Sequence, residues 1–264
     1  MDDADPHAPP IFERTLCGVD GTAESLVAVR QAVRLQEAEV MLYLAAVAPL
    51  VKAAHAGMAA SHAADLMQQE AEAALADARA IAPSASAKLV NGDPVEVLLR
   101  EVESEQATLV AVGSHGRGRA AGMVLGTVAA RMVRDAACSV LVARGARDPE
   151  KWPRSVVAGV DGSAESAAAY RVARSLAERF GGSVRAVAAS ADQLDREAAH
   201  AITSELEEQP GRAVDELAAA SDSADLVIVG SRGLHGFKAL GSVSERVAQR
   251  ARSSVVVVRP GPEE

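Results

Sequence analysis

The sequence predicts an α/β fold of two tandem domains, each a doubly wound sheet of five parallel strands, with the second copy reduced. Short apolar runs alternate with helical segments, a pattern typical of a parallel sheet covered by helices on both faces. A segment rich in glycine and hydroxyl residues follows an apolar strand twice, at 109–127 and at 226–242. A strand followed by Asp-Gly also occurs twice, at 15–25 and at 156–166. Two matches in the same order indicate an internal repeat.

Each element of the first copy has a local signal. The first strand ends in Asp-Gly, and Thr22 is placed to cap the next helix, with Glu24 in its first turn. Asn91 to Pro94 predicts a turn that places proline at a favoured early helical position. Apolar alternation marks the strands and amphipathic spacing marks the helices. The predicted elements are, in order, strand 11–19, helix 22–37, strand 40–47, a helix around 62–80, strand 87–91, helix 95–104, strand 108–113, helix 126–136 and strand 139–143.

The second copy is shorter than the first. The Asp-Gly segments are 141 residues apart and the glycine loops only 117, so 24 residues are lost between these landmarks. The loss falls after strand 183–189, where the second helix and third strand belong, and predicts a short or irregular sheet edge. Trp152 is interpreted as a packing anchor between the domains rather than a ligand-stacking residue. The predicted divisions are a disordered tail at 1–10, a first domain at 11–146, a linker at 147–153 and a shortened second domain at 154–260.

Composition argues against several classes of function. The net charge of −9 and the 2% of aromatic residues disfavour nucleic-acid binding, which needs a basic face and stacking rings. No apolar run approaches the ~20 residues of a membrane span, and the acidic N-terminus is unlike a signal peptide. Cys17 and Cys138 are expected to be buried thiols in a reducing compartment. We therefore expect a soluble, cytoplasmic protein without membrane or nucleic-acid partners.

The glycine segments predict a phosphate site at one end of the sheet. Ligands of open parallel sheets bind beyond the carboxyl ends of strands, where the strand order reverses. If the first and fourth strands are neighbours, Asp20 and Gly113 lie on the two sides of that crevice. A carboxylate suits ribose or adenine, while glycine N–H groups, a helix N-terminus and the Thr127 hydroxyl suit phosphate. The Asp-Gly pair could instead be only a helix-starting turn, and Arg117 and Arg119 could either neutralise phosphate or be solvated.

Taken together, these motifs resemble the universal stress proteins. The resemblance rests on Gly113-x2-Gly116-x9-Gly126-Thr127 after an apolar strand, with an earlier strand ending Val-Asp-Gly, and covers nearly the whole chain beyond residue 10. It implies two tandem domains of the adenine nucleotide alpha-hydrolase type. In the ATP-binding branch it implies adenosine at the first-strand aspartate and after the second strand, with phosphates at the glycines. The implied nucleotide-binding residues are Asp20, Ala45, Gly113, Ser114, Gly116, Arg117, Gly126 and Thr127.

The second copy keeps the corresponding residues on a shorter loop. Seven residues separate Gly233 from Gly241, against nine in the first copy, so the path around a phosphate must be tighter. The first copy has Ala129 where the family's nucleotide-binding pattern often has a second hydroxyl residue, whereas the second copy has Ser244. The candidate residues of the second copy are Asp161, Gly230, Gly233, Gly241, Ser242 and Ser244.

The predicted function is adenine-nucleotide binding (ATP or AMP, with or without Mg²⁺) by a stress-response regulator that has an unidentified protein partner. No catalytic residue or metal ligand is assigned, because no nucleophile, base or metal set converges on the site. Ser114 and His115 are adjacent, and adjacent loop side chains are not expected to aim at each other. Two alternatives stay open: a nucleotide-free tandem scaffold for protein–protein interaction and, more weakly, a slow ATPase.

The closing strands, 139–143 and 254–258, predict how the domains associate. Both are strongly β-forming and would otherwise be exposed sheet edges that invite association. We expect them to pair or pack together as an internal pseudo-two-fold dimer, as the resemblance to dimeric single-domain relatives also implies. The same surfaces or the outer helices could also form a homodimer.

Overall fold

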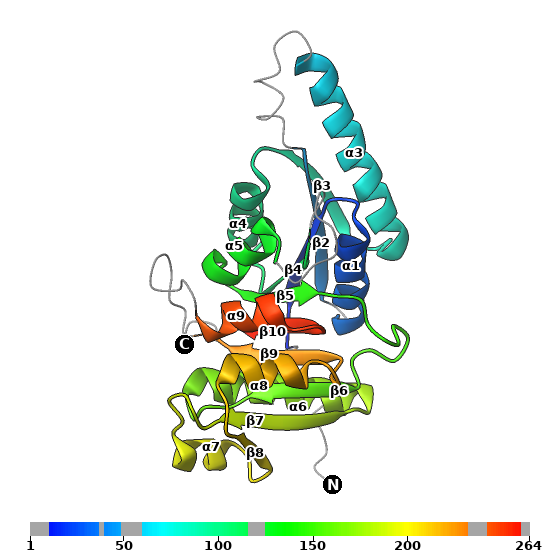
Figure 1. Cartoon of the computed structure of the whole chain (residues 1–264). Helices are drawn as coiled ribbons and strands as arrows, with labels where there is room; N and C mark the ends of the chain where they lie inside the picture. The colour runs from blue at the N-terminus through cyan, green and yellow to red at the C-terminus, as the bar shows by residue number, and fades with distance from the viewer. Residues whose placement is uncertain (1–10, 37–39, 49–59, 116–124, 232–241, 260–264) are drawn as a thin grey trace.

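The computed structural model describes residues 11–36, 40–48, 60–115, 125–231 and 242–259. In these ranges helices cover both faces of a single twisted sheet, and the two sequence copies form its two halves (Figure 1). The first half alternates strands and helices: β1 (Arg14–Val19), α1 (Ala23–Leu35), β2 (Met41–Ala48), α3 (Ala60–Ile81), β3 (Ser86–Asn91), α4 (Pro94–Ser104), β4 (Leu109–Gly113), α5 (Thr127–Asp135) and β5 (Ser139–Ala143).

The second half repeats this alternation in shorter elements. It keeps a second helix and a third strand after strand 183–189, where these elements were expected to be lost, whereas the predicted short sheet edge is confirmed. They survive as α7 with seven residues and β8 with four, so the edge is short but present. The elements are β6 (Ser155–Gly159), α6 (Ala164–Phe180), β7 (Ser183–Ala189), α7 (Arg196–Ile202), β8 (Leu206–Gln209), α8 (Ala213–Ala220), β9 (Leu226–Gly230), α9 (Val243–Arg250) and β10 (Ser254–Val258).

The strand order confirms the predicted doubly wound topology. Ten strands follow the order β3-β2-β1-β4-β5-β10-β9-β6-β7-β8 among the described residues. In each half the neighbours are parallel, and the first strand pairs with the fourth, β1 with β4 and β6 with β9. The order therefore reverses between these strands in both halves, which is where an open α/β sheet forms its ligand crevice.

The two halves meet at an antiparallel seam, which confirms the predicted pairing of the closing strands. β5 and β10 are hydrogen-bonded neighbours, with Leu141 opposite Val256, and every residue of both strands is buried. The pairing removes two sheet edges that would otherwise be open to other chains. The homodimer and the exact domain limits stay predictions; β5 ends at Ala143 and β6 begins at Ser155.

Small aliphatic residues fill the core on both faces of the sheet. One face packs beneath α1, α3 and α6, and the other beneath α4, α5, α8 and α9. Trp152 is the large exception: it is 1% exposed, belongs to the first of these cores, and donates from Nε1 to the Asp225 carbonyl at 3.0 Å. Its interpretation as a packing residue is therefore confirmed.

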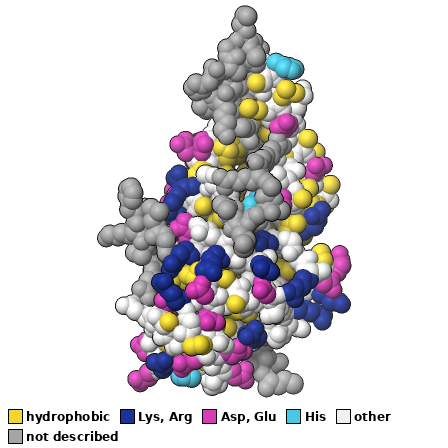
Figure 2. Space-filling view, viewed as in Figure 1, with side chains coloured by type: hydrophobic (Ala, Val, Ile, Leu, Met, Phe, Trp, Pro, Cys, Tyr) yellow, Lys and Arg dark blue, Asp and Glu magenta, His cyan; other side chains and the backbone are white. Residues whose placement is uncertain are grey.

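The charges on the surface and the character of the helices address only part of what the sequence predicts about partners. Figure 2 shows Lys and Arg side chains intermixed with Asp and Glu on the displayed face. None of the helices in the described part of the chain combines the length and the apolar character that crossing a bilayer requires. The absence of nucleic-acid and membrane partners and the cytoplasmic location stay predictions.

Both cysteines are buried free thiols, as expected. Burial raises the pKa of Cys17 and of Cys138 to about 12 in each case. Iodoacetamide at pH 8.5 should therefore leave both unmodified in the folded protein and label both in urea, because only the thiolate is alkylated. Rapid labelling of the folded protein, counted by intact mass, would contradict this protection.

Because the raised pKa values of Cys17 and Cys138 lie above those of unfolded thiols, the free energy of unfolding should fall as the pH rises from about 9 to 12.

Candidate functional site

A cavity of about 460 Å³ opens at the carboxyl ends of β1 and β4 in the first half. Such a volume is within the range of small-molecule sites. The central strands, the first turns of three helices and the side of α3 form its walls. The lining residues are Gly18, Val19, Asp20, Ser25, Ala45, Val47, Met67, Glu70, Ala71, Pro94, Leu98, Val112, Gly113, His115, Gly126, Thr127, Val128 and Ala129.

Asp20 has both of the roles that its sequence context suggested. Its Oδ1 accepts from the Thr22 backbone N–H at 3.0 Å and from the Thr22 hydroxyl at 2.6 Å. Thr22 in turn caps α1 by accepting from the Ser25 N–H at 3.2 Å. Asp20 is therefore part of a helix-starting turn, and it also lines the cavity. The turn holds the carboxylate in a fixed position beside the crevice.

The opposite side of the crevice is formed by the end of β4 and the start of α5. A Cβ on Gly113 would lie 2.8 Å from the Ser25 backbone nitrogen, so only glycine lets β4 end this close to α1. Gly126 caps α5 with φ −63° and ψ 154° and supplies no side-chain bond. Its N–H donates to the Ser114 carbonyl at 2.8 Å. The positive end of the α5 dipole at Thr127 therefore faces the cavity and favours an anion.

Ser114 and His115 contact each other, contrary to expectation. The Ser114 hydroxyl lies 2.9 Å from His115 Nδ1. Ser114 is only 2% exposed and does not line the cavity, whereas His115 does. The Ser114 N–H donates to the Ala143 carbonyl at 3.0 Å. The Ser114 side chain thus contacts His115 rather than the cavity, and its assignment as a nucleotide contact stays a prediction.

The structure brings together five of the eight residues predicted for the first copy. Asp20, Ala45, Gly113, Gly126 and Thr127 all line one cavity. Gly116 and Arg117, and the neighbouring Arg119, lie outside the described residues.

Sequence reasoning missed the walls formed by α3 and α4. Met67, Glu70 and Ala71 on α3, with Pro94 and Leu98 on α4, close the side of the cavity near β2. The amphipathic pattern of the α3 segment was visible in the sequence. It did not show which turn of the helix would face the crevice, because that depends on how the helix crosses β2.

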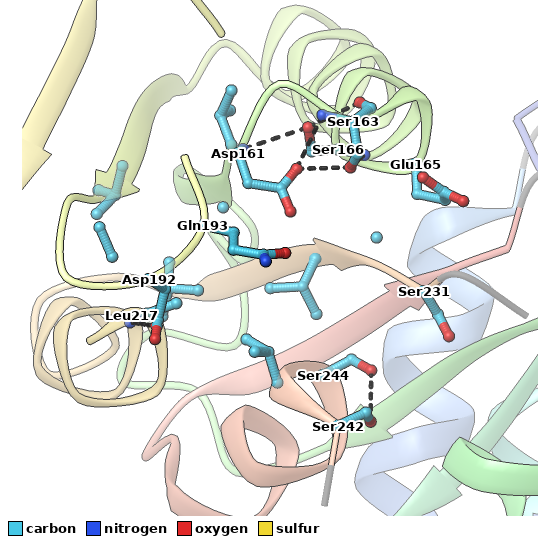
Figure 3. Close-up of a pocket in the computed structure, with 18 of the residues that line it drawn as sticks. Asp161, Ser163, Glu165, Ser166, Asp192, Gln193, Leu217, Ser231, Ser242 and Ser244 are labelled. Atoms are coloured by element: carbon cyan, nitrogen blue, oxygen red, sulfur yellow. Dashed lines mark hydrogen bonds between the residues drawn. The ribbon is translucent and has the colours of Figure 1, made fainter. Parts of the chain in front are cut away.

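The second half has an equivalent cavity of about 360 Å³. Asp161 repeats the turn of its counterpart, accepting from the Ser163 N–H at 2.9 Å and from the Ser163 hydroxyl at 2.5 Å. On the other side Ser242 caps α9 by accepting from the Glu245 N–H, and its hydroxyl lies 3.2 Å from that of Ser244. Figure 3 shows these two groups on opposite sides of the cavity.

Four of the six residues predicted for the second copy line this cavity: Asp161, Gly230, Ser242 and Ser244. Gly233 and Gly241 lie outside the described residues. The missed residues include Asp192 and Gln193, from the short connection after β7, and Gln193 projects between the two sides in Figure 3.

Asp192 also has a structural role beside the second cavity. Its Oδ2 accepts from the Ala213 N–H at 2.7 Å, at the start of α8. The residue before α8, Arg212, makes no capping bond of its own. The connection after β7 thus supplies a helix cap from a distant part of the sequence. No local motif signals such a contact.

Comparison with known proteins gives one consistent family. A sequence model of the universal stress protein family matches residues 12–144 and 185–259. A universal stress protein of Mycolicibacterium smegmatis is 30% identical over 93% of this chain and 96% of that protein. One of Mycobacterium tuberculosis is 33% identical over 67% of this chain and 69% of its own length. The crystal structure of a universal stress protein from Archaeoglobus fulgidus superposes with a TM-score of 0.74 at 22% identity, covering 96% of this chain and 98% of that one, which supports the fold.

Proposed function

This chain belongs to the universal stress protein family, and from that premise we propose that it binds an adenine nucleotide, ATP or AMP, in the cavity of its first half. Nucleotide in this cavity would change the shape of the protein, or the partner protein that it binds, in a stress response. The observation that carries the proposal is the joint placement of Asp20 and the N-terminus of α5 on two sides of one crevice.

The cavity has chemistry suited to both ends of a nucleotide. The fixed carboxylate of Asp20 can accept from ribose hydroxyls, and Ala45, Met67 and Ala71 offer apolar surface for a base. The first turn of α5 offers the N–H and the hydroxyl of Thr127 and the positive end of the helix dipole for phosphate. No group of three or more His, Cys, Asp or Glu in the described part of the chain could hold a metal. Mg²⁺ would therefore depend mainly on phosphate oxygens.

Calorimetric titration of nucleotide-stripped protein with ATP and AMP tests the proposal. We expect saturable binding below millimolar concentration, with an affinity that falls when the phosphate end is altered. An absence of heat up to millimolar nucleotide would overturn it and favour the tandem scaffold, a candidate that the continuous ten-stranded sheet supports. Formation of ADP during long incubation would indicate a slow ATPase.

Asp20→Asn should weaken nucleotide binding about fivefold to tenfold. The amide retains an oxygen for the Thr22 N–H, so the turn is kept, but the bond to a ribose hydroxyl loses its charge assistance, worth about 1 kcal/mol. Asp93→Asn is the matched control, because Asp93 also starts a helix, α4, and does not line the cavity. Equal effects of the two variants on affinity would contradict the assigned role of Asp20.

A further inference from the structure

An arginine follows each of the two seam strands, and the two side chains make matching contacts across the seam. Arg144 after β5 donates to the Ala248 and Ser253 carbonyls, at the end of α9 and just beyond it. Arg259 after β10 donates to the Val133 and Cys138 carbonyls, near the end of α5 and just beyond it. Each backbone N–H donates to the opposite seam serine, Ser254 or Ser139. The pseudo-two-fold axis thus relates one arginine to the other.

The two arginines differ in what else they reach. Arg259 lines the cavity of the second half, whereas Arg144 does not line that of the first. Val258 pairs with Gly230, and the Ser231 N–H donates to the Val258 carbonyl at 3.0 Å. Arg259, the residue after Val258, therefore lies at the glycine end of the crevice, on the same side as Ser242.

The protein around Arg259 compensates its charge only in part. Its guanidinium donates to the neutral carbonyl oxygens of Val133 and Cys138, and its buried Nε has no hydrogen-bond partner among the described residues. It is the one Lys or Arg among the described residues that line this cavity, whereas those that line the first cavity include none. Burial lowers the pKa of Arg259, and the Asp135 carboxylate opposes that shift. A buried cation of this kind is stabilised by an anionic ligand.

We propose that Arg259 makes the second cavity a site for a phosphate-bearing ligand, with its guanidinium and the Ser242 and Ser244 hydroxyls facing the phosphate. Residues of the first half hold Arg259 in place through the Val133 and Cys138 carbonyls, so this site is complete only when both halves are joined. The inference rests on the proposed function in one respect, that these cavities bind nucleotide-like ligands. It adds that charge recognition differs between them.

The test measures the second cavity alone, in a Gly126→Asp background that closes the first. Calorimetry with ATP, AMP and adenosine on this protein should show tighter binding of ATP and AMP than of adenosine. Adding Arg259→Gln should weaken the binding of ATP and AMP about tenfold and leave the affinity for adenosine within twofold of its value before that change. Arg259→Lys, which keeps the charge, should retain the preference for phosphate and guards against a loss of folding in the glutamine variant.

Arg144→Gln in the same background is the matched control. It removes the equivalent contacts across the seam and loosens α9, which belongs to the second cavity, but it removes no cation from either cavity. We expect Arg144→Gln to change the affinities for all three ligands equally and by less than threefold. Equal losses for the three ligands in Arg259→Gln, a loss of phosphate preference in Arg144→Gln, or no binding in the Gly126→Asp background would each overturn the inference. Failure of the proposed function would appear separately, as an absence of first-cavity binding in the otherwise unaltered chain.

Discussion

Replacing Gly126 with Asp should weaken ATP binding in the first cavity by roughly 100-fold or more. The new carboxylate would stand at the N-cap of α5, facing the phosphates, and two like charges about 4 Å apart repel by about 4 kcal/mol at an effective dielectric constant of 20. Because Asp is a preferred N-cap residue and the φ of −63° suits any residue, the helix should be retained. Calorimetry on nucleotide-stripped protein measures the change in affinity.

Gly126→Asn separates charge from size in this experiment. Asn is also a favoured N-cap and is nearly the same shape as Asp, so it should fold equally well and weaken ATP far less than Asp does. Adenosine, which has no phosphate, should bind both variants with similar affinity. A similar ATP affinity in the Asp and Asn variants would show that the phosphates do not lie at the start of α5.

Trp152→Ala should lower the free energy of unfolding by about 3 to 5 kcal/mol, the usual cost of removing a large buried aromatic side chain. Trp152 is 1% exposed and contacts both halves: its carbonyl accepts from Arg34 on α1, and its indole donates to the Asp225 carbonyl before β9. Urea unfolding followed by circular dichroism measures the loss, since the variant has no tryptophan to report by fluorescence.

Two further variants show whether that loss of stability comes from removing a large buried ring. Trp152→Phe keeps a ring and gives up the 3.0 Å indole bond, so it should cost clearly less than the alanine variant. Leu66→Ala, at a position that is 46% exposed, should stay within about 0.5 kcal/mol of the original protein. A Trp152→Ala effect as small as that of Leu66→Ala would mean that the linker does not contribute to joining the halves.

Most of the fold could be predicted because its signals are local and repeated. Strand ends at Asp20 and Gly113, the cap at Thr22 and the proline at the start of α4 all depend on neighbours in sequence. The seam followed from two strongly β-forming strands that needed covering. The second helix and third strand of the shorter copy were missed because seven and four residues are too few for a clear periodic pattern.

The site could be predicted only where backbone motifs determine it. Glycines and helix starts are typical of phosphate sites, so Gly113, Gly126 and Thr127 could be named from the sequence, and all three line the first cavity. The walls contributed by Met67, Gln193 and Arg259 depend on how distant elements cross the crevice, and no sequence pattern specifies this. For Ser114 the motif does not show which side of the loop the hydroxyl faces, and in the structure that hydroxyl contacts His115 and does not line the cavity.

Native mass spectrometry of the nucleotide-stripped protein, recorded as ATP is added, is the sharpest test of nucleotide binding because it counts ligands on each intact chain. We expect a complex of the chain with at least one ATP at sub-millimolar concentration. We also expect one fewer ATP per chain in the Gly126→Asp variant and the full number in Gly126→Asn. A chain that carries no ATP at millimolar concentration, or an ATP count unaffected by Gly126→Asp, would contradict this expectation.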